Sequence, residues 1–459
     1  MTYSKFIRNK LGVVASAGID TPLRGYDLFP HQRDLTAWAL RRGRAAIFAD
    51  TGLGKMRMAI AWADAVTAHS GRPVIILCPL AVAQQFVSEA RIMGTKVTHC
   101  REAQDVVAGI NITNYDRMHR FNMSQFSGVA LDESSIIKSH ASRTLALLIA
   151  AFRHTPYKLC CTATPSPNDW TELGTHAEFL GVRSRAEMLA EFFVHDGGDT
   201  SVWRLKGHAR QVFWRWVASW GAMIRSPADL GYDARAYDLP PLNIHQHTVE
   251  IEHNSAHGLF AMEAQTLTER RQARRDSMAQ RVKACADLVN SDSAPWIVWC
   301  DLNDEGDMLE KAIPGSVQVA GSDDNDIKEA RMVGFSAGQH RVLISKQKIC
   351  GWGLNFQHCA NQAFVGVNDS YEGFYQAIRR SWRFGQKRPV HIHVFASNQD
   401  GSVVANIKRK QDAAQDMAAK MASETLAAVR DSVLGARKNT NEYAAGNRVS
   451  IPAFLATSA

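Results

Sequence analysis

Three groups of polar residues in this sequence have the types and spacing needed to hold a phosphate and activate water. The first is the run A-D-T-G-L-G-K-M at 49–56, which follows a short apolar stretch. Glycines let backbone N–H groups approach phosphate oxygens, a following helix adds the positive end of its dipole, and a lysine supplies a point charge. A purely structural turn is the alternative. The predicted phosphate-contact residues are Asp50, Thr51, Gly52, Leu53, Gly54, Lys55 and Met56.

Met56 stands where such a loop usually carries Ser or Thr, whose hydroxyl holds Mg²⁺. A thioether is a poor ligand for this hard cation. Two outcomes therefore remain open. Asp132 could hold the metal through water at some cost in affinity or rate, or hydrolysis could be weakened or lost.

The second group is the carboxylate pair Asp132 and Glu133, which ends the apolar run G-V-A-L-D. Two carboxylates at the end of a buried strand are costly unless a cation or a proton compensates them. In a nucleotide site Asp132 would hold Mg²⁺, and Glu133 would orient and deprotonate the attacking water. The alternative is a helix N-cap, because Asp and Ser cap helices well.

The third group lies in Q-A-I-R-R-S-W-R-F-G-Q at 376–386, where Arg380 and Arg383 are three residues apart and share a helix face. Arginines that face a phosphate loop from another lobe stabilise charge on the transferring phosphoryl group, an effect of about 10³–10⁵ in rate. The alternative is a solvated basic face.

Two series of short apolar runs provide the elements that must position these groups. Amphipathic stretches separate the runs, and this rhythm predicts parallel sheets with helices on both faces. The fold class is therefore α/β, with two parallel-sheet lobes and a cleft between them. The first series occupies 45–49, 74–78, 109–113, 128–132 and 158–162, and the second 296–300, 316–320, 341–345, 362–367 and 390–395.

The two series define the predicted domain boundaries. An aromatic-rich stretch between them predicts a small helical insertion, and Pro240–Pro241 predicts the hinge. An Ala-rich helix over 403–434 and a turn-rich tail follow the second series. The predicted domains are 1–182 for the first lobe, 183–241 for the helical insertion and hinge, 242–398 for the second lobe, and 399–459 for the tail.

Composition narrows the class of protein. The chain has 459 residues, and 53 basic against 45 acidic residues leave a net charge of +8, which suits a polyanionic partner. Its apolar runs are too short to span a bilayer, and residues 1–23 carry no secretory pattern, so we expect a cytoplasmic protein. None of the eight cysteines forms a C-x-x-C pair, which makes a zinc ribbon improbable. His391 and His393 share a strand face without a third ligand nearby in the sequence, so plain strand residues are predicted there.

The order of these motifs resembles the superfamily-two helicases, and within them the Swi/Snf-related double-stranded DNA translocases. The resemblance covers about 26–395. It implies two RecA-like lobes, ATP and Mg²⁺ as cofactors, and further nucleotide contacts from Gln32, Gly353 and Gln376. Ser134–Ser135 departs from the family's commoner Ala/Gly-His pair, and the short chain is typical of a compact bacterial or phage member. Besides the three groups above, the similar segments are L-F-P-H-Q, T-A-T-P-S-P-N-D-W-T-E-L, A-M-I-R-S-P-A-D-L and G-W-G-L-N.

The resemblance also implies that DNA crosses both lobes opposite the hinge, with candidate contacts at Pro79, Thr113 and Asn355. The basic segment 268–283 is a further candidate. Its Arg270, Arg274 and Arg281 fall near one helical face, where they could grip phosphates or form a solvated face. No segment indicates base-specific reading, so binding should depend on the backbone and on salt.

These features together predict an ATP-driven motor on double-stranded DNA, with single-stranded DNA or RNA as alternative partners. Two other functions stay open. One is a strand-separating helicase on DNA or RNA. The other is a nucleotide-gated DNA-binding module with little turnover, which Met56 would suit.

Overall fold

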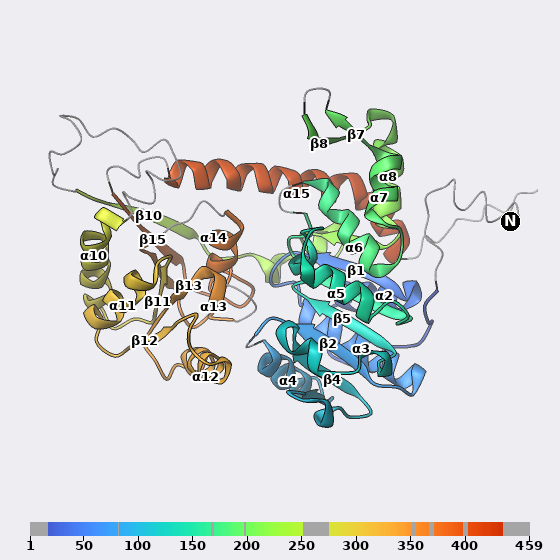
Figure 1. The fold of residues 1–459 in the computed structure, drawn as a ribbon, viewed down its shortest axis with the longest axis horizontal. Coiled ribbons are helices and arrows are strands. Elements are labelled where there is room, and N and C mark those ends of the chain that lie inside the picture. Colours follow the sequence, from blue (N-terminus) through green and yellow to red (C-terminus); the bar gives the residue numbers. More distant parts are fainter. Residues whose placement is uncertain are drawn as a thin grey trace, which may run out of the picture.

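Two parallel β-sheets divide the chain into two lobes that lie side by side (Figure 1). The structure, a computed structural model, describes residues 17–80, 82–166, 169–196, 199–250, 275–350, 355–366, 371–397 and 403–434. The predicted α/β class with two RecA-like lobes is confirmed. Within the described ranges, no helix combines the length and the apolar character that crossing a bilayer requires.

The first sheet has seven parallel strands in the order β3-β4-β2-β5-β6-β1-β9. Five of them coincide with the first series of predicted apolar runs. Because helices cover both faces, a central strand such as β2 (V-I-I-L-C) is apolar along its whole length, whereas β4 (I-N-I-T-N) alternates apolar and polar residues. Their bounds are β1 Arg44–Ala49, β2 Val74–Cys78, β3 Val97–His99, β4 Ile110–Asn114, β5 Gly128–Asp132, β6 Tyr157–Thr162 and β9 Gly221–Ile224.

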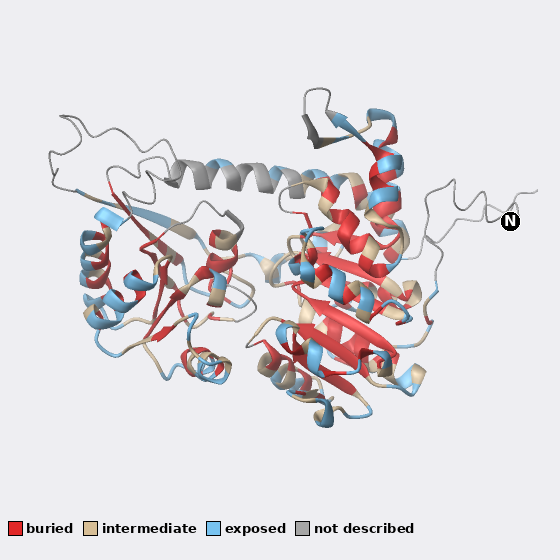
Figure 2. Ribbon diagram, in the orientation of Figure 1, coloured by how far each residue is buried: buried red, intermediate tan, exposed pale blue. Residues whose placement is uncertain are grey.

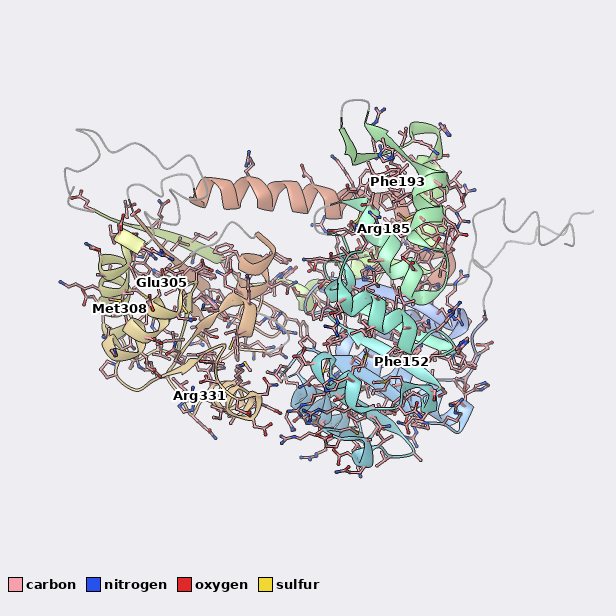
Figure 3. The ribbon with its side chains drawn as sticks, in the orientation of Figure 1. Phe152, Arg185, Phe193, Glu305, Met308 and Arg331 are labelled. Atoms are coloured by element: carbon pink, nitrogen blue, oxygen red, sulfur yellow. The ribbon has the colours of Figure 1, made fainter. Side chains whose placement is uncertain are left out.

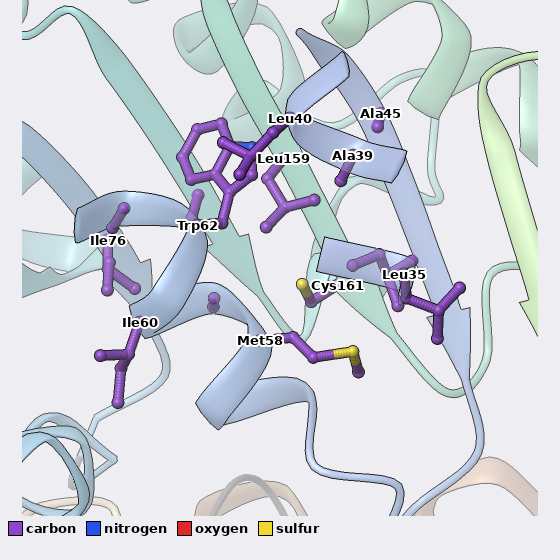
Figure 4. Packing of buried hydrophobic residues seen from close by; sticks show 14 of the residues in the cluster. Leu35, Ala39, Leu40, Ala45, Met58, Ile60, Trp62, Ile76, Leu159 and Cys161 are labelled. Carbon is purple, nitrogen blue, oxygen red and sulfur yellow. The ribbon is translucent and has the colours of Figure 1, made fainter. Parts of the chain in front are cut away.

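Two hydrophobic cores lie on opposite faces of this sheet. Along β1, Ala45 and Ile47 join one core and Ala46 and Phe48 the other, because successive strand side chains point to opposite faces. Figure 4 shows part of the first core, where Trp62 and its neighbours pack against the strands. Helices α2 (Pro30–Arg42), α3 (Lys55–Ser70) and α4 (Ala83–Ile92) build the first core, and α5 (Arg143–Ala151), α6 (Leu173–Leu180) and α8 (Arg210–Ala218) the second.

The segment predicted as a helical insertion is only partly helical. Helix α7 (Arg185–Phe192) and α8 flank an antiparallel hairpin of β7 (Phe193–Asp196) and β8 (Asp199–Leu205). The segment also contains β9, which pairs in parallel with β1. The first sheet therefore extends past the predicted boundary at 182. The four residues of β9 are too few to show a periodic pattern, which explains why the sequence did not reveal it.

The second sheet has six parallel strands in the order β10-β15-β14-β11-β13-β12. Helices again cover both faces, with α10 and α11 in one core and α12 and α14 in the other. The strands are β10 Leu242–Val249, β11 Trp296–Cys300, β12 Ser316–Val319, β13 Val342–Lys346, β14 Asn361–Phe364 and β15 Val390–Ser397. The helices are α10 Met278–Asn290, α11 Asn303–Ala312, α12 Asn325–Ser336, α13 Gln347–Cys350 and α14 Tyr371–Ile378.

Strand β10 has no counterpart among the predicted runs, because it is an edge strand with mostly polar or exposed residues. It brings two histidines to the pair noted in the sequence. His245 Nε2 lies 3.1 Å from His391 Nδ1, and His247 Nε2 lies 2.9 Å from His393 Nδ1. Among the described residues, no group of three or more His, Cys, Asp and Glu side chains has an arrangement that could hold a metal ion.

The predicted C-terminal helix is present as α15 (Val403–Val433), which runs from the second lobe back onto the first (Figures 1 and 2). Val429 and Val433, one helical turn apart, are buried in the first core. Trp38 Nε1 of α2 donates a hydrogen bond of 2.8 Å to Ser432 Oγ. The lobes are thus joined twice, by the hinge at Pro240–Pro241 and by α15.

Arg281, which the sequence placed on a basic phosphate-gripping face, is instead a core residue of the second lobe, only 1 % exposed. Its Nη2 pairs with Glu305 Oε1 at 2.9 Å, and its Nη1 donates to the Val365 carbonyl. Figure 3 labels Glu305 on α11. Of the three arginines, Arg281 alone lies within the described residues, and helix periodicity could not tell that its side of α10 turns inward.

The buried pair makes a prediction about stability. Replacing Glu305 with Ala leaves the Arg281 charge buried without compensation, and we expect a loss of about 3–5 kcal/mol in unfolding free energy. Urea denaturation followed by circular dichroism measures this loss. The matched control is Asp304→Asn on the exposed side of α11, which should change stability by less than about 0.5 kcal/mol. Equal effects of the two substitutions would contradict the assignment.

Candidate active site

A pocket of about 400 Å³ lies between the lobes at the carboxyl end of the first sheet. In open α/β sheets, ligands bind at this edge. The pocket brings together most of the predicted nucleotide residues from both lobes. Those lining it are Gln32, Thr51, Gly52, Gly54, Lys55, Met56, Asp132 and Glu133 from the first lobe, and Asn355, Arg380 and Arg383 from the second.

The glycine-rich loop between β1 and α3 is tightly held from behind. Gly52 and Gly54 have φ angles of 88° and 84°, a region that side chains rarely tolerate. A Cβ on Gly54 would lie 2.1 Å from the Gln32 side-chain nitrogen. That nitrogen donates a hydrogen bond of 3.1 Å to the Leu53 carbonyl. Gln32 therefore fixes the loop in addition to lining the pocket.

Lys55 is the first residue of α3, and its side chain lines the pocket. Its Nζ donates to the carbonyls of Ala49 at 2.8 Å and Asp50 at 3.2 Å. Burial lowers the pKa of Lys55, while the nearby carboxylates of Glu133, Asp50 and Asp132 oppose that shift. An anion bound next to Lys55 would favour its charged form and so oppose the effect of burial on its pKa.

The carboxylate pair at the end of β5 is the electrostatically costly part of the pocket. Asp132 and Glu133 are each 8 % exposed. Burial, and then the charge of Glu133, raise the pKa of Asp132 to about 7, against the opposing effect of Lys55 and Arg380. A divalent cation beside Asp132 would replace the proton that this carboxylate tends to keep.

Glu133 has an unusual backbone and an unpaired side-chain oxygen. Its φ of 49° is the one positive value among the non-glycine residues of the described ranges. Such a conformation is strained and persists only where the surroundings enforce it. Its buried Oε2 has no hydrogen-bond partner among the described residues. Glu133 is therefore placed to accept a proton from a water or ligand inside the pocket.

The two arginines of the second lobe follow α14 and are oriented by their neighbours. Arg380 donates from Nε to the Gln376 carbonyl at 3.1 Å and from Nη2 to Gln376 Oε1 at 3.2 Å. Arg383 Nη1 donates to Asn355 Oδ1. Burial and the charge of Arg380 lower the pKa of Arg383 to about 9, so it remains charged at neutral pH. Gln376 is thus a positioning residue, buried behind the pocket.

The groups in the pocket fit a polyphosphate with a divalent cation. Lys55, Arg380 and Arg383 are among the cationic side chains that line it, and Arg383 Nε and Glu133 Oε2 are buried polar atoms without partners in the described part of the chain. A phosphate oxygen and a water would satisfy these two atoms respectively. Asp132 is the oxygen ligand available to Mg²⁺, and Met56 lines the same pocket without offering one.

Asp50 and Leu53 do not line this pocket. Asp50 Oδ2 accepts a 2.9 Å hydrogen bond from Arg379 Nη2, and Asp50 Oδ1 accepts a 3.4 Å hydrogen bond from the Tyr375 hydroxyl, so Asp50 ties the loop to the second lobe. The Leu53 side chain is buried in the first core, and it contributes only its carbonyl to the loop. The sequence analysis predicted every residue of the loop as a nucleotide contact. It could not distinguish the side chains that face away from the pocket.

The predicted nucleic-acid contacts fall in three places. Pro79 follows β2 and Thr113 lies near the end of β4, at the same sheet edge but beyond the pocket. The prediction for Thr113 is wrong, because its side chain is fully buried in the sheet and offers no surface to a strand. Asn355 lies inside the pocket, beside Arg383, and so is a candidate nucleotide residue instead. Arg270, Arg274 and Gly353 lie outside the described residues.

The sequence analysis missed an aromatic cluster at one end of the pocket. Phe29, Tyr237 and Phe384 come from before α2, from before the hinge and from the second lobe. The ring centroids of Tyr237 and Phe384 are 4.8 Å apart, and those of Phe29 and Tyr237 are 5.9 Å apart. Aromatic side chains of this kind stack on the flat rings of ligands. Phe29 and Phe384 lie inside quoted motifs and could have been found, whereas no motif includes Tyr237.

No family model matches the chain, and no curated protein sequence matches it. The resemblance to superfamily-two motors therefore stays a prediction from motif order, now joined by a pocket in which residues of both lobes meet.

The raised pKa of Asp132 predicts how stability depends on pH. Between about pH 4 and pH 7 the folded protein keeps a proton on Asp132 that the unfolded chain releases, so the stability contributed by this group falls as pH rises through that window. Asp132→Asn has no such proton. We expect the ligand-free variant to be more stable than wild type at pH 8, and the difference to shrink toward pH 4.

Thermal denaturation at several pH values, without nucleotide or metal, measures this difference. Asp116→Asn removes a carboxylate from an exposed position in the same lobe and serves as the control. A pH-independent difference between Asp132→Asn and wild type would contradict the shifted pKa.

Proposed function

We propose that this chain is a nucleic-acid-dependent ATP hydrolase, a motor that moves along double-stranded DNA. The observation that carries the proposal is the shared pocket, in which Lys55, Asp132 and Glu133 of one lobe meet Arg380 and Arg383 of the other. Neither lobe holds all five residues. Turnover would therefore depend on the angle between the lobes, which is what a motor needs to convert hydrolysis into movement.

Each residue has a role in this proposal. Lys55 binds the β- and γ-phosphates, and Asp132 holds Mg²⁺, which when bound polarises the phosphoryl oxygens. Glu133 orients the attacking water and accepts its proton. Arg380 and Arg383 stabilise the charge that develops on the transferring group. The aromatic cluster around Tyr237 suits a purine base, at the end of the pocket away from the carboxylates.

The proposal that nucleic acid is the partner rests on the net charge of the chain and on the resemblance. The chain carries a net charge of +8, and the predicted backbone contact Pro79 follows β2 at the sheet edge that carries the pocket. Hydrolysis and DNA contact would then act on the same edge. Closing and opening of the cleft would move one lobe along the strand relative to the other.

The first test is ATP hydrolysis with and without nucleic acid. We expect duplex DNA to stimulate turnover, with single-stranded DNA and RNA compared alongside. Arg380→Ala and Arg383→Ala should lower kcat by about 10³–10⁵ while nucleotide binding stays within a few-fold of wild type. Lys55→Ala should abolish nucleotide binding. The control is Lys387→Ala, which removes an exposed cation from the same segment. No stimulation by any nucleic acid in a folded sample would refute the motor.

Met56 favours a second candidate, a nucleotide-gated DNA-binding module with little turnover. The motor and the module differ in wild-type activity and in the response to Met56→Thr, which supplies the missing hydroxyl. For the motor we expect brisk DNA-stimulated turnover in wild type, and Met56→Thr should chiefly lower the Mg²⁺ concentration needed for half-maximal rate. Met56→Leu is the matched control because it adds no ligand. Negligible wild-type turnover that Met56→Thr raises sharply would favour the module.

A strand-separating helicase is the alternative motor. The hairpin of β7 and β8 projects from the first lobe (Figure 1), and a wedge between strands would need such an element. Displacement of a third strand from a triplex requires only movement along duplex DNA, whereas unwinding of a tailed duplex requires strand separation. Comparing the two substrates distinguishes a translocase from a helicase.

A further inference from the structure

The carboxyl edge of the first sheet has a second functional half. The residues that follow β1 and β5 line the pocket, whereas β2, β4 and β3 end at the same edge beyond the pocket. Two arginines follow this second half: Arg101 shortly after β3, and Arg117 in the short 3₁₀-helix η2 (Tyr115–Arg120) after β4. We call the surface formed by Arg101, Arg117 and His99 the outer edge.

The outer edge contains buried polar atoms that lack partners. Arg117 is 9 % exposed, and its Nη1 has no hydrogen-bond partner among the described residues. The same is true of His99 Nε2, and His99 is close enough to be affected by the charges of Arg101, Arg117 and Glu329. A polar group buried without a partner is costly, because it has lost its hydrogen bonds to water. Two such atoms beside two arginines suit an anionic, oxygen-rich ligand.

Carboxylates from the other lobe partly cover this surface. Asp326 and Glu329 of α12 face it from the second lobe (Figure 1). Asp326 Oδ1 lies 3.4 Å from Arg101 Nη1 and 3.5 Å from Arg117 Nη2, and Glu329 Oε2 lies 4.0 Å from Arg101 Nη2. These ion pairs are long, and none is a close bidentate contact of the kind that arginine makes with a well-placed oxyanion.

We propose that the outer edge binds a phosphate of a nucleic-acid backbone through Arg101 and Arg117, and that Asp326 and Glu329 occupy this position when no nucleic acid is bound. The inference rests on the proposed function and deepens it by naming residues that hold the strand. A phosphodiester group places two non-bridging oxygens, which share one negative charge, where the carboxylates now lie, and it can reach Arg117 Nη1 once α12 moves away. The acidic start of α12 thus acts as an internal competitor.

The strength of the contacts fits competition. Water and salt screen ion pairs between exposed side chains, and Asp326 and Arg101 have 57 % and 49 % of their side chains exposed. A few such pairs close the outer edge without preventing a ligand from opening it. Displacing them would separate α12 from β3 and β4, so strand binding would change the angle between the lobes and with it the shared pocket.

Binding of labelled oligonucleotides without nucleotide tests the proposal. A duplex, a single DNA strand and an RNA of one sequence are compared by fluorescence anisotropy over a salt series. The double substitution Asp326→Asn/Glu329→Gln should raise affinity about 5-fold. Arg117→Ala and Arg101→Ala should each weaken binding and reduce the slope of log K against log salt by about 1. Arg101 is half exposed, so its variant keeps the test valid should Arg117→Ala fail to fold.

Two control variants carry matched charge changes outside the contact. Arg120→Ala removes a cation from η2, and Asp304→Asn removes a carboxylate from α11. Salt slopes and affinities that are the same in the Arg101, Arg117 and Arg120 variants would overturn the inference while leaving the proposed motor in place. A wild-type protein that binds none of the three nucleic acids at low salt would overturn both. Unchanged affinity in the Asp326/Glu329 variant would refute the competition.

Discussion

The electrostatic balance of the interlobe pocket is the constraint on which the rest of the structure depends. Two carboxylates at the end of a buried strand, Asp132 and Glu133, are tolerated because Lys55 lies on one side and Arg380 on the other. The balance is incomplete, since the pKa of Asp132 is raised to about 7 and Glu133 keeps an unpaired oxygen. A cleft in this condition is stabilised by any ligand that brings both phosphate and a divalent cation. The parallel sheet makes the arrangement possible, because it gathers loop, acids and hinge at one edge.

Three kinds of connection hold the lobes in the position that forms this pocket. The hinge at Pro240–Pro241 is covalent, whereas α15 continues the chain of the second lobe and packs non-covalently onto the first core. The pair between Asp50 and Arg379 joins the glycine-rich loop directly to the second lobe. Because Asp50 is the first residue of the loop, a change in the lobe angle acts on the loop backbone. This link between movement and phosphate contact lies within a few residues of Lys55.

Much of the fold and of the pocket could be predicted because their signals are local. A glycine loop after an apolar strand, acids at a strand end and arginines three apart were enough to identify Lys55, Asp132 and Arg380. The elements that escaped prediction depend on tertiary context. Strands β9 and β10 are short or polar, so pairing with a neighbour defines them, not periodicity. Arg281 lies on the predicted helix face, but only the position of α11 decides that this face is buried.

Movement of the lobes relative to each other requires that the contacts between them be individually weak. One set, Asp50 with Arg379, lies beside the pocket, and the other, Arg101 and Arg117 with α12, lies at the far end of the same sheet edge. A ligand shifts a conformational equilibrium only by its difference in affinity for the two states. The pairs that Asp326 makes are exposed and screened by water, so a nucleotide or a strand can shift that equilibrium. Since coupling between two binding sites is reciprocal, a strand that opens the outer edge must alter nucleotide affinity by the factor by which nucleotide alters strand affinity. An ion pair between the lobes that was as deeply buried as the Arg281–Glu305 pair would hold them in one position and abolish this reciprocal coupling.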